Sequence, residues 1–194
     1  MIKGEITLAK VITGKIRLSF VNLAEPKDDM QGNQFYSAQI IIDKTDTRTV
    51  QAFEKAVAAL RQDPKALAKV NNNEKAIQVP FRDGDTDTAD SVANAPDVYE
   101  GKYFVNAKNK RKVLCLGKSK EPLEPFDIEE QLYSGCYAQV QLSLYVYNAN
   151  GNKGVGVGLE AVRKVADGDR LGGTTVKVND FDDDLVEDAE DDVF

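Results

Sequence analysis

Residues 136–147 read CYAQVQLSLYVY, and apolar side chains occupy every second position. Such alternation is typical of a β-strand that turns one face to a core and the other to solvent. The Asn-Gly pair at residues 150–151 follows at once and predicts a hairpin turn into a last strand over residues 154–165. This stretch therefore indicates a long hairpin in a sheet with one buried face.

Upstream of this hairpin, the same period and the turn residues predict further strands. Strands are expected over residues 6–20, with a break near Gly14, and over residues 36–42 and 77–81. Two more are expected over residues 102–107 and 112–117, and a turn at 108–111 would join these two into a basic hairpin. Apolar residues at helical spacing over residues 46–61 predict one helix, and a short helical turn follows Pro64. Residues 82–95 and 121–132 have the composition of loops, and the second segment has room for one helical turn.

We therefore expect a mainly β protein with one inserted α-helix. The pattern fits an OB-fold, a five-stranded antiparallel Greek-key barrel with extended hairpins, although periodicity alone also permits a sandwich. The length suits a single domain over residues 1–175. Residues 176–194 are too acidic and too poor in apolar residues to fold, so we expect a disordered acidic tail there.

The composition excludes several classes of enzyme. The chain contains no His, which rules out Ser-His-Asp hydrolysis, Cys-His proteolysis and His-containing zinc sites. Its two Cys lie in apolar, strand-like contexts and predict buried, reduced thiols. We find no signal peptide and no membrane-spanning stretch. We therefore expect a cytoplasmic protein that is not an enzyme and holds no metal or other cofactor.

The net charge of -7 conceals an uneven distribution. The last 15 residues hold nine of the 32 acids and no base, so residues 1–179 carry 25 bases against 23 acids. The most basic stretch has seven positive residues and no acid between Glu100 and Glu121. This stretch is a candidate surface for an anionic partner, and the acidic tail is a candidate interaction segment.

Aromatic and basic side chains together predict a nucleic-acid-binding surface. Bases stack on aromatic rings such as the three Tyr on the polar face of residues 136–147, and lysines neutralise phosphates. The simpler alternatives are that Tyr favours strands and that lysines keep a hairpin tip in solution. The candidate residues are Lys15, Arg17, Tyr99, Lys102, Tyr103, Lys108, Lys110, Arg111, Lys112, Tyr137, Tyr145 and Tyr147.

Two competing interpretations come from the acidic residues. Asp83, Asp85, Asp87 and Asp90 would hold Mg2+ in a nuclease or nuclease subunit, although their loop departs from the spacing of a calcium loop. The acidic tail would also suit a protein mimic of DNA. A separate feature, the alternating glycines at residues 154, 156 and 158, predicts the close approach of a backbone or of a flat group.

The chain resembles phage single-stranded DNA-binding proteins. The resemblance rests on the acidic end DDVF at residues 191–194 and on YFVNA at 103–107, YSGCY at 133–137 and KGVGVGL at 153–159. It implies an OB-fold that binds single-stranded DNA without sequence preference in replication, recombination and repair, in the host cytoplasm if a phage encodes it. It also implies that Asp191, Asp192, Val193 and Phe194 recruit replication proteins such as a phage DNA polymerase or helicase/primase, and it leaves a homo-oligomer open.

Overall fold

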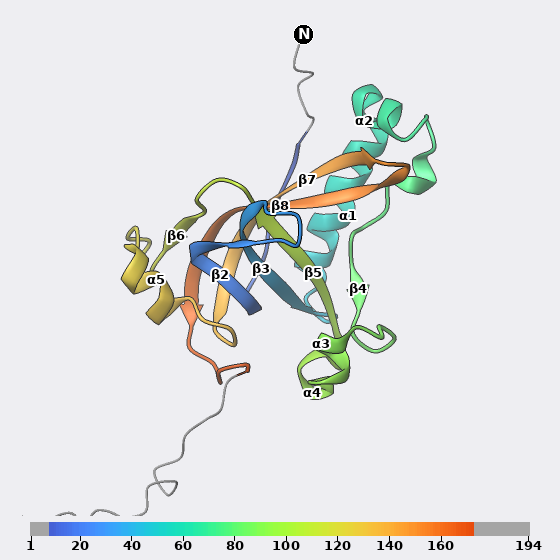
Figure 1. Ribbon diagram of the computed structural model, residues 1–194. Coiled ribbons are helices and arrows are strands. Elements are labelled where there is room, and N and C mark those ends of the chain that lie inside the picture. Colours follow the sequence, from blue (N-terminus) through green and yellow to red (C-terminus); the bar gives the residue numbers. More distant parts are fainter. Residues whose placement is uncertain (1–7, 173–194) are drawn as a thin grey trace, which may run out of the picture.

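The computed structural model describes residues 8–172, and most of its elements are strands (Figure 1). The strands are β1 (Ala9–Ile12), β2 (Ile16–Asp28), β3 (Gln34–Asp43), β4 (Arg82–Asp83), β5 (Lys102–Asn109), β6 (Leu114–Leu116), β7 (Tyr137–Ala149) and β8 (Asn152–Ala166). The helices are α1 (Thr47–Gln62), α2 (Pro64–Lys69), α3 (Asp90–Ala93), α4 (Pro96–Tyr99) and α5 (Pro125–Gln131), with a 3-10 turn at Glu74–Ala76. The expected tail over residues 176–194 lies outside the described residues.

Five of the strands close into a ring. β2 pairs with β3, β3 with β5, β5 with β8, β8 with β7, and β7 again with β2. This ring confirms the expected mainly β architecture of the OB type. One pair departs from the expected antiparallel arrangement, because β5 and β8 run parallel where Lys108 faces Gly158. The chain between them passes through β6, α5 and β7, which is a long enough crossover for parallel pairing.

The core lies where the alternation in β7 predicts it. Ala138, Val140, Leu142 and Leu144 expose none of their surface, and Val146 exposes 1%. The long helix α1 covers one end of this core with Phe53 and Leu60. Its start is fixed by Asp46, whose carboxylate accepts a hydrogen bond from the Thr49 backbone N–H at 3.1 Å. The expected inserted helix is therefore present, and four shorter helices accompany it among the described residues.

The protruding end of the β7–β8 hairpin rests against α2 (Figure 1). The Lys69 ammonium donates a hydrogen bond to the Val146 carbonyl at 3.1 Å, and the Asn148 amide donates one to the Lys69 carbonyl at 3.0 Å. The helical insertion thus holds the end of the hairpin from one side.

The expected basic hairpin between residues 102–107 and 112–117 is wrong. Both segments contain strands, but β5 and β6 follow one another along the same edge of β8 and run parallel to it. β7 occupies the other edge of β8. Residues 110–113 therefore connect two strands that run in the same direction, and they do not reverse the chain. Two successive strands that both run parallel to β8 cannot be antiparallel to each other.

Smaller expectations have mixed outcomes. The break near Gly14 is confirmed, because it separates β1 from β2. Residues 77–81 form no strand, and β4 is confined to Arg82–Asp83. Cys115 and Cys136 lie buried as expected, and burial raises the pKa of the Cys115 thiol to about 11. Within residues 8–172, no helix combines the length and the apolar character needed to cross a membrane.

Candidate nucleic-acid interface

Tyr145 and Tyr147 lie on the face of β7 that points away from the core, as their positions in the alternation predict. Tyr147 exposes 38% of its surface, and Tyr145 is half-buried. Burial raises the pKa of Tyr145, and the neighbouring Tyr147 raises it further, so the phenol stays neutral. The two rings thus offer uncharged aromatic surface at the outside of the barrel.

Two of the three alternating glycines of β8 lie directly under these rings, and the third, Gly158, faces Ser143. Gly156 faces Tyr145 and Gly154 faces Tyr147 across the β7–β8 ladder. A Cβ atom added to Gly156 would lie 2.5 Å from Cζ of Tyr145, and one added to Gly154 would lie 3.1 Å from the Tyr147 hydroxyl oxygen. The flat group that the glycines accommodate is therefore the pair of tyrosine rings, which lie across β8.

A groove of about 720 Å³ runs past the two rings. Its aromatic residues are Phe20, Tyr145 and Tyr147, its polar floor contains Asn22, Ser37, Gln39 and Asn106, and its cations are Arg82 and Lys108. Val105, Ala107, Val155 and Val157 supply apolar surface between them. Aromatic walls, amide groups and flanking cations are the elements that a single nucleic-acid strand requires.

Phe20 is a groove residue that sequence reasoning missed. Its alternation with Ile16 and Leu18 placed it on the apolar face, yet 56% of its surface is exposed. The strand is irregular here, with a register shift between Ser19 and Asn22, and Phe20 has a φ of +47°. A bulky residue at positive φ is strained, and such strain clusters at functional sites. No pattern in the sequence separates Phe20 from the buried residues before it.

A second hollow of about 710 Å³ continues the groove and shares Lys108 and Tyr145 with it. Its four cations, which we call the basic rim, are Lys108, Lys110, Arg111 and Lys112. The ammonium groups of Lys108 and Lys110 lie 4.3 and 5.4 Å from the centroid of the Phe35 ring. This ring holds the two lysine side chains over one surface, so positive charge continues from the groove into the turn after β5.

The structure places three of the candidate residues away from this groove. Tyr99 exposes 1% of its surface and contacts the edge of Phe104, which corrects the expectation of an exposed aromatic flank. Lys102 forms an ion pair with Asp43. Tyr103 stacks on Phe81 with 5.0 Å between ring centroids. Tyr99 is the last residue of α4 and packs with Val92 of α3 against Phe104, whereas Tyr103 packs against the main core.

Lys15, Arg17 and Tyr137 form a separate group that lines neither hollow. The Lys15 ammonium lies 5.1 Å from the centroid of the Tyr137 ring, and the Arg17 guanidinium carbon lies 5.9 Å from it. Arg17 also donates hydrogen bonds to the carbonyls of Gly135 and Asp169, at 3.2 and 2.9 Å. Arg17 thus ties the segment after β8 to the barrel.

The acidic loop is held by cations of the chain itself. The Lys44 ammonium bonds Asp83 at 2.5 Å and Asp85 at 2.6 Å, and the Arg82 guanidinium bonds Asp87 at 2.6 Å. These bonds lower the pKa of all three carboxyls. The pairings account for three of the four acids that the nuclease interpretation assigned to Mg2+, all except Asp90.

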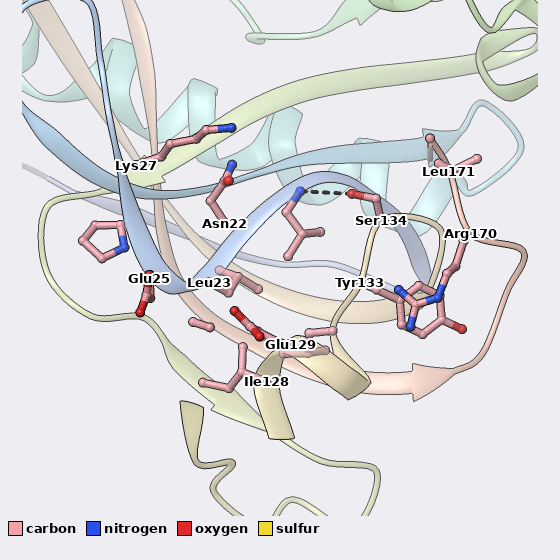
Figure 2. A pocket seen from close by; sticks show the side chains of 15 residues that line it. Asn22, Leu23, Glu25, Lys27, Ile128, Glu129, Tyr133, Ser134, Arg170 and Leu171 are labelled. Atoms are coloured by element: carbon pink, nitrogen blue, oxygen red, sulfur yellow. Dashed lines mark hydrogen bonds between the residues drawn. The ribbon is translucent and has the colours of Figure 1, made fainter. Parts of the chain in front are cut away.

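A third hollow, of about 510 Å³, lies between β2, α5 and the segment after β8 (Figure 2). The Arg170 guanidinium lies 4.2 Å from the centroid of the Tyr133 ring, and both side chains are drawn at one side of it. Glu25 and Glu129 also line it. These two carboxylates balance the two cations of this hollow, Lys27 and Arg170, whereas four cations and one carboxylate line the hollow of the basic rim. Charge therefore favours the groove at Phe20 and the basic rim as the nucleic-acid interface.

Comparison with known proteins identifies the family of the chain. The family model described as Enterobacter phage Enc34, ssDNA-binding protein matches residues 9–194. The comparison with curated proteins finds no match.

Solved structures share the fold. The C-terminal truncation of the bacteriophage Enc34 single-stranded DNA-binding protein has a TM-score of 0.69 at 20% identity and covers 84% of this chain and 89% of that one. The same protein in complex with ssDNA has a TM-score of 0.67 at 20% identity, over 84% of this chain and 90% of that one. The bacteriophage T7 single-stranded DNA-binding protein gp2.5 has a TM-score of 0.56 at 16% identity, over 97% and 98%.

Proposed function

The chain belongs to the family of the Enterobacter phage Enc34 single-stranded DNA-binding protein, and from this premise we propose that it binds single-stranded DNA in the groove beside Tyr145. The observation that carries the proposal is the continuity of aromatic wall and basic rim, which share Lys108 and Tyr145. Bases stack on Phe20, Tyr145 and Tyr147, while phosphates contact the rim. Neither interaction depends strongly on base identity, so many sequences bind.

The same geometry supports a role without catalysis. The groove contains no His, and its amides and tyrosines are suited to holding bases rather than to activating water. A protein of this kind covers exposed strands during phage DNA replication and recombination, in the host cytoplasm. This biological role rests on the family and on the groove together.

Fluorescence anisotropy with a labelled single-stranded oligonucleotide tests the proposal. We expect binding that duplex DNA competes for weakly, and no cleavage when Mg2+ is added. Tyr145→Ala should weaken binding by roughly 1–3 kcal/mol with little change in its salt dependence, because stacking is not an ionic interaction. Tyr137→Ala, on the same strand but outside the groove, is the matched control. Equal losses in the two variants would move the DNA to another face, and oligonucleotide cleavage would favour the nuclease.

We also propose that the acidic C-terminal residues recruit replication proteins. The support is the sequence of residues 191–194, in which an aromatic and an apolar side chain follow two acids. A pocket can recognise these groups together. Pull-downs from infected cells should recover a polymerase or helicase/primase with the full chain and lose it with Phe194→Ala. If both proteins recover the polymerase or helicase/primase equally, Phe194 does not recruit it.

A further inference from the structure

Three side chains connect the core to the floor of the groove. Tyr99, which is buried, donates a hydrogen bond from its hydroxyl to Oε1 of Gln39 at 2.5 Å. Gln39, of which 5% is exposed, donates from Nε2 to Oδ1 of Asn106 at 3.1 Å. Asn106 is exposed and lines the groove. The buried tyrosine is thereby linked to a side chain that a ligand can touch.

The direction of these hydrogen bonds fixes which groups of Asn106 face the groove. Burial raises the pKa of Tyr99, so its hydroxyl keeps its proton, and hydrogen bonds with Ser19 and Ser91 act on the same oxygen. The hydroxyl donates its proton to the Gln39 oxygen, and the Gln39 NH2 group points at Asn106. If the Asn106 amide were flipped, its NH2 group would face the NH2 group of Gln39, and two donors would oppose each other. The Asn106 oxygen therefore stays toward Gln39. Within residues 8–172, no hydrogen bond uses the Asn106 NH2 as donor, which leaves this group for a ligand.

The walls of the groove determine which part of a nucleotide meets this NH2 group. If a base stacks on Tyr145 or Phe20 and its phosphate lies at the basic rim, the sugar stays outside. The base edge farthest from the sugar, which is the Watson–Crick edge, then points to the floor. The floor thus reads the edge that differs between thymine and cytosine.

We propose that Asn106 donates a hydrogen bond to the carbonyl at the 4-position of one bound pyrimidine, so that thymine is favoured over cytosine at that subsite. The inference rests on the proposed function and refines it. Thymine has a carbonyl at the 4-position, where cytosine has an amino group that opposes another donor. Asparagine recognises adenine through its oxygen and NH2 together, and the oxygen here is already engaged by Gln39. Tyr99 and Gln39 act as positioning residues.

The test compares oligo-dT with oligo-dC of equal length, and oligo-dU controls for the thymine methyl group. In the native protein, dT and dU should both bind about 2- to 10-fold more tightly than dC, which is the effect of one hydrogen bond. Asn106→Asp replaces the donor with an acceptor of the same shape. Its carboxylate should weaken all three strands and reverse the order in favour of dC, whose amino group it can accept.

Two further variants separate an effect on base preference from an effect on the folding of the protein. Asn106→Ala removes the donor without adding charge and should bring the dT/dC ratio close to one. Tyr99→Phe keeps the buried ring but frees the Gln39 amide, so the ratio should fall toward one while the melting temperature shows a folded protein. If the native ratio is one, or if the Asn106 variants keep the native ratio, the proposal is overturned. A native protein that binds none of the strands would instead overturn the proposed function.

Discussion

Phe20 combines a strained backbone with an exposed ring, and Phe20→Gly separates the effects of the two on stability and on binding. The φ of +47° costs the native protein about 1–3 kcal/mol, which glycine recovers, whereas glycine in a strand loses about 0.5–1 kcal/mol of chain entropy. The covered part of the ring contributes about 1 kcal/mol, because 56% of the side chain is already exposed. The free energy of unfolding should therefore change by no more than about 1.5 kcal/mol in either direction.

The affinity for single-stranded DNA should change much more. Loss of one stacked base costs roughly 1–3 kcal/mol, which corresponds to about 5- to 150-fold in the dissociation constant. Anisotropy titrations at several salt concentrations measure this loss, and the slope of log affinity against log salt should stay the same because no charge is removed. Thermal denaturation of the same samples measures stability.

Phe126→Ala is the control, because Phe126 exposes 78% of its surface on α5 and lines neither part of the groove. It should leave affinity unchanged. Unaltered DNA affinity in Phe20→Gly would show that Phe20 does not stack on bases. A loss of stability of about 3–5 kcal/mol, typical of a buried Phe, would show that the ring belongs to the core.

The basic rim, the acidic loop and the tail give three more predictions. Alanine at all four rim positions should flatten the salt slope by nearly 3 units, about 0.7 for each lost phosphate contact, and an unchanged slope would place the phosphates elsewhere. Because Lys44 lowers the pKa of Asp83 and Asp85, its bonds stabilise the fold above their unfolded value of about 3.9 and lose this effect as pH falls through the lowered pKa. Melting curves should therefore show native protein and Lys44→Met converging below about pH 4, and a constant difference would contradict the assignment. Deleting residues 180–194 should tighten DNA binding, most at low salt where screening is weakest, whereas equal affinities at every salt concentration would exclude competition by the tail.

The sequence predicted β7 well because one face of this strand is completely buried. A strand with an apolar core on one side must alternate, so the positions of Tyr145 and Tyr147 followed from Val140 and Leu144. The capped helix α1 and the barrel were also predictable, since both depend on local patterns and on a count of strands.

Other features depend on contacts that no local pattern records. Residues 108–111 have the composition of a hairpin turn, and only the pairing of β5 and β6 with the same edge of β8 shows that they do not form one. The hydroxyl of Tyr99 is compatible with an exposed position, yet this hydroxyl donates a hydrogen bond to the Gln39 amide inside the fold. Phe20 leaves the apolar face through an irregularity in β2 that the residues around it do not signal.

The pairing of β8 has a consequence for the synthesis of the protein on the ribosome. The wall of the groove is on β7 and β8, while Asn106 and Lys108 are on β5, and these strands come together only when β8 pairs with both. A nascent chain that lacks β8 would have an open barrel with unpaired strand edges, which are prone to aggregate. Premature termination should therefore yield chains that a cell removes, and no fragment ending before residue 152 should retain a part of the binding activity.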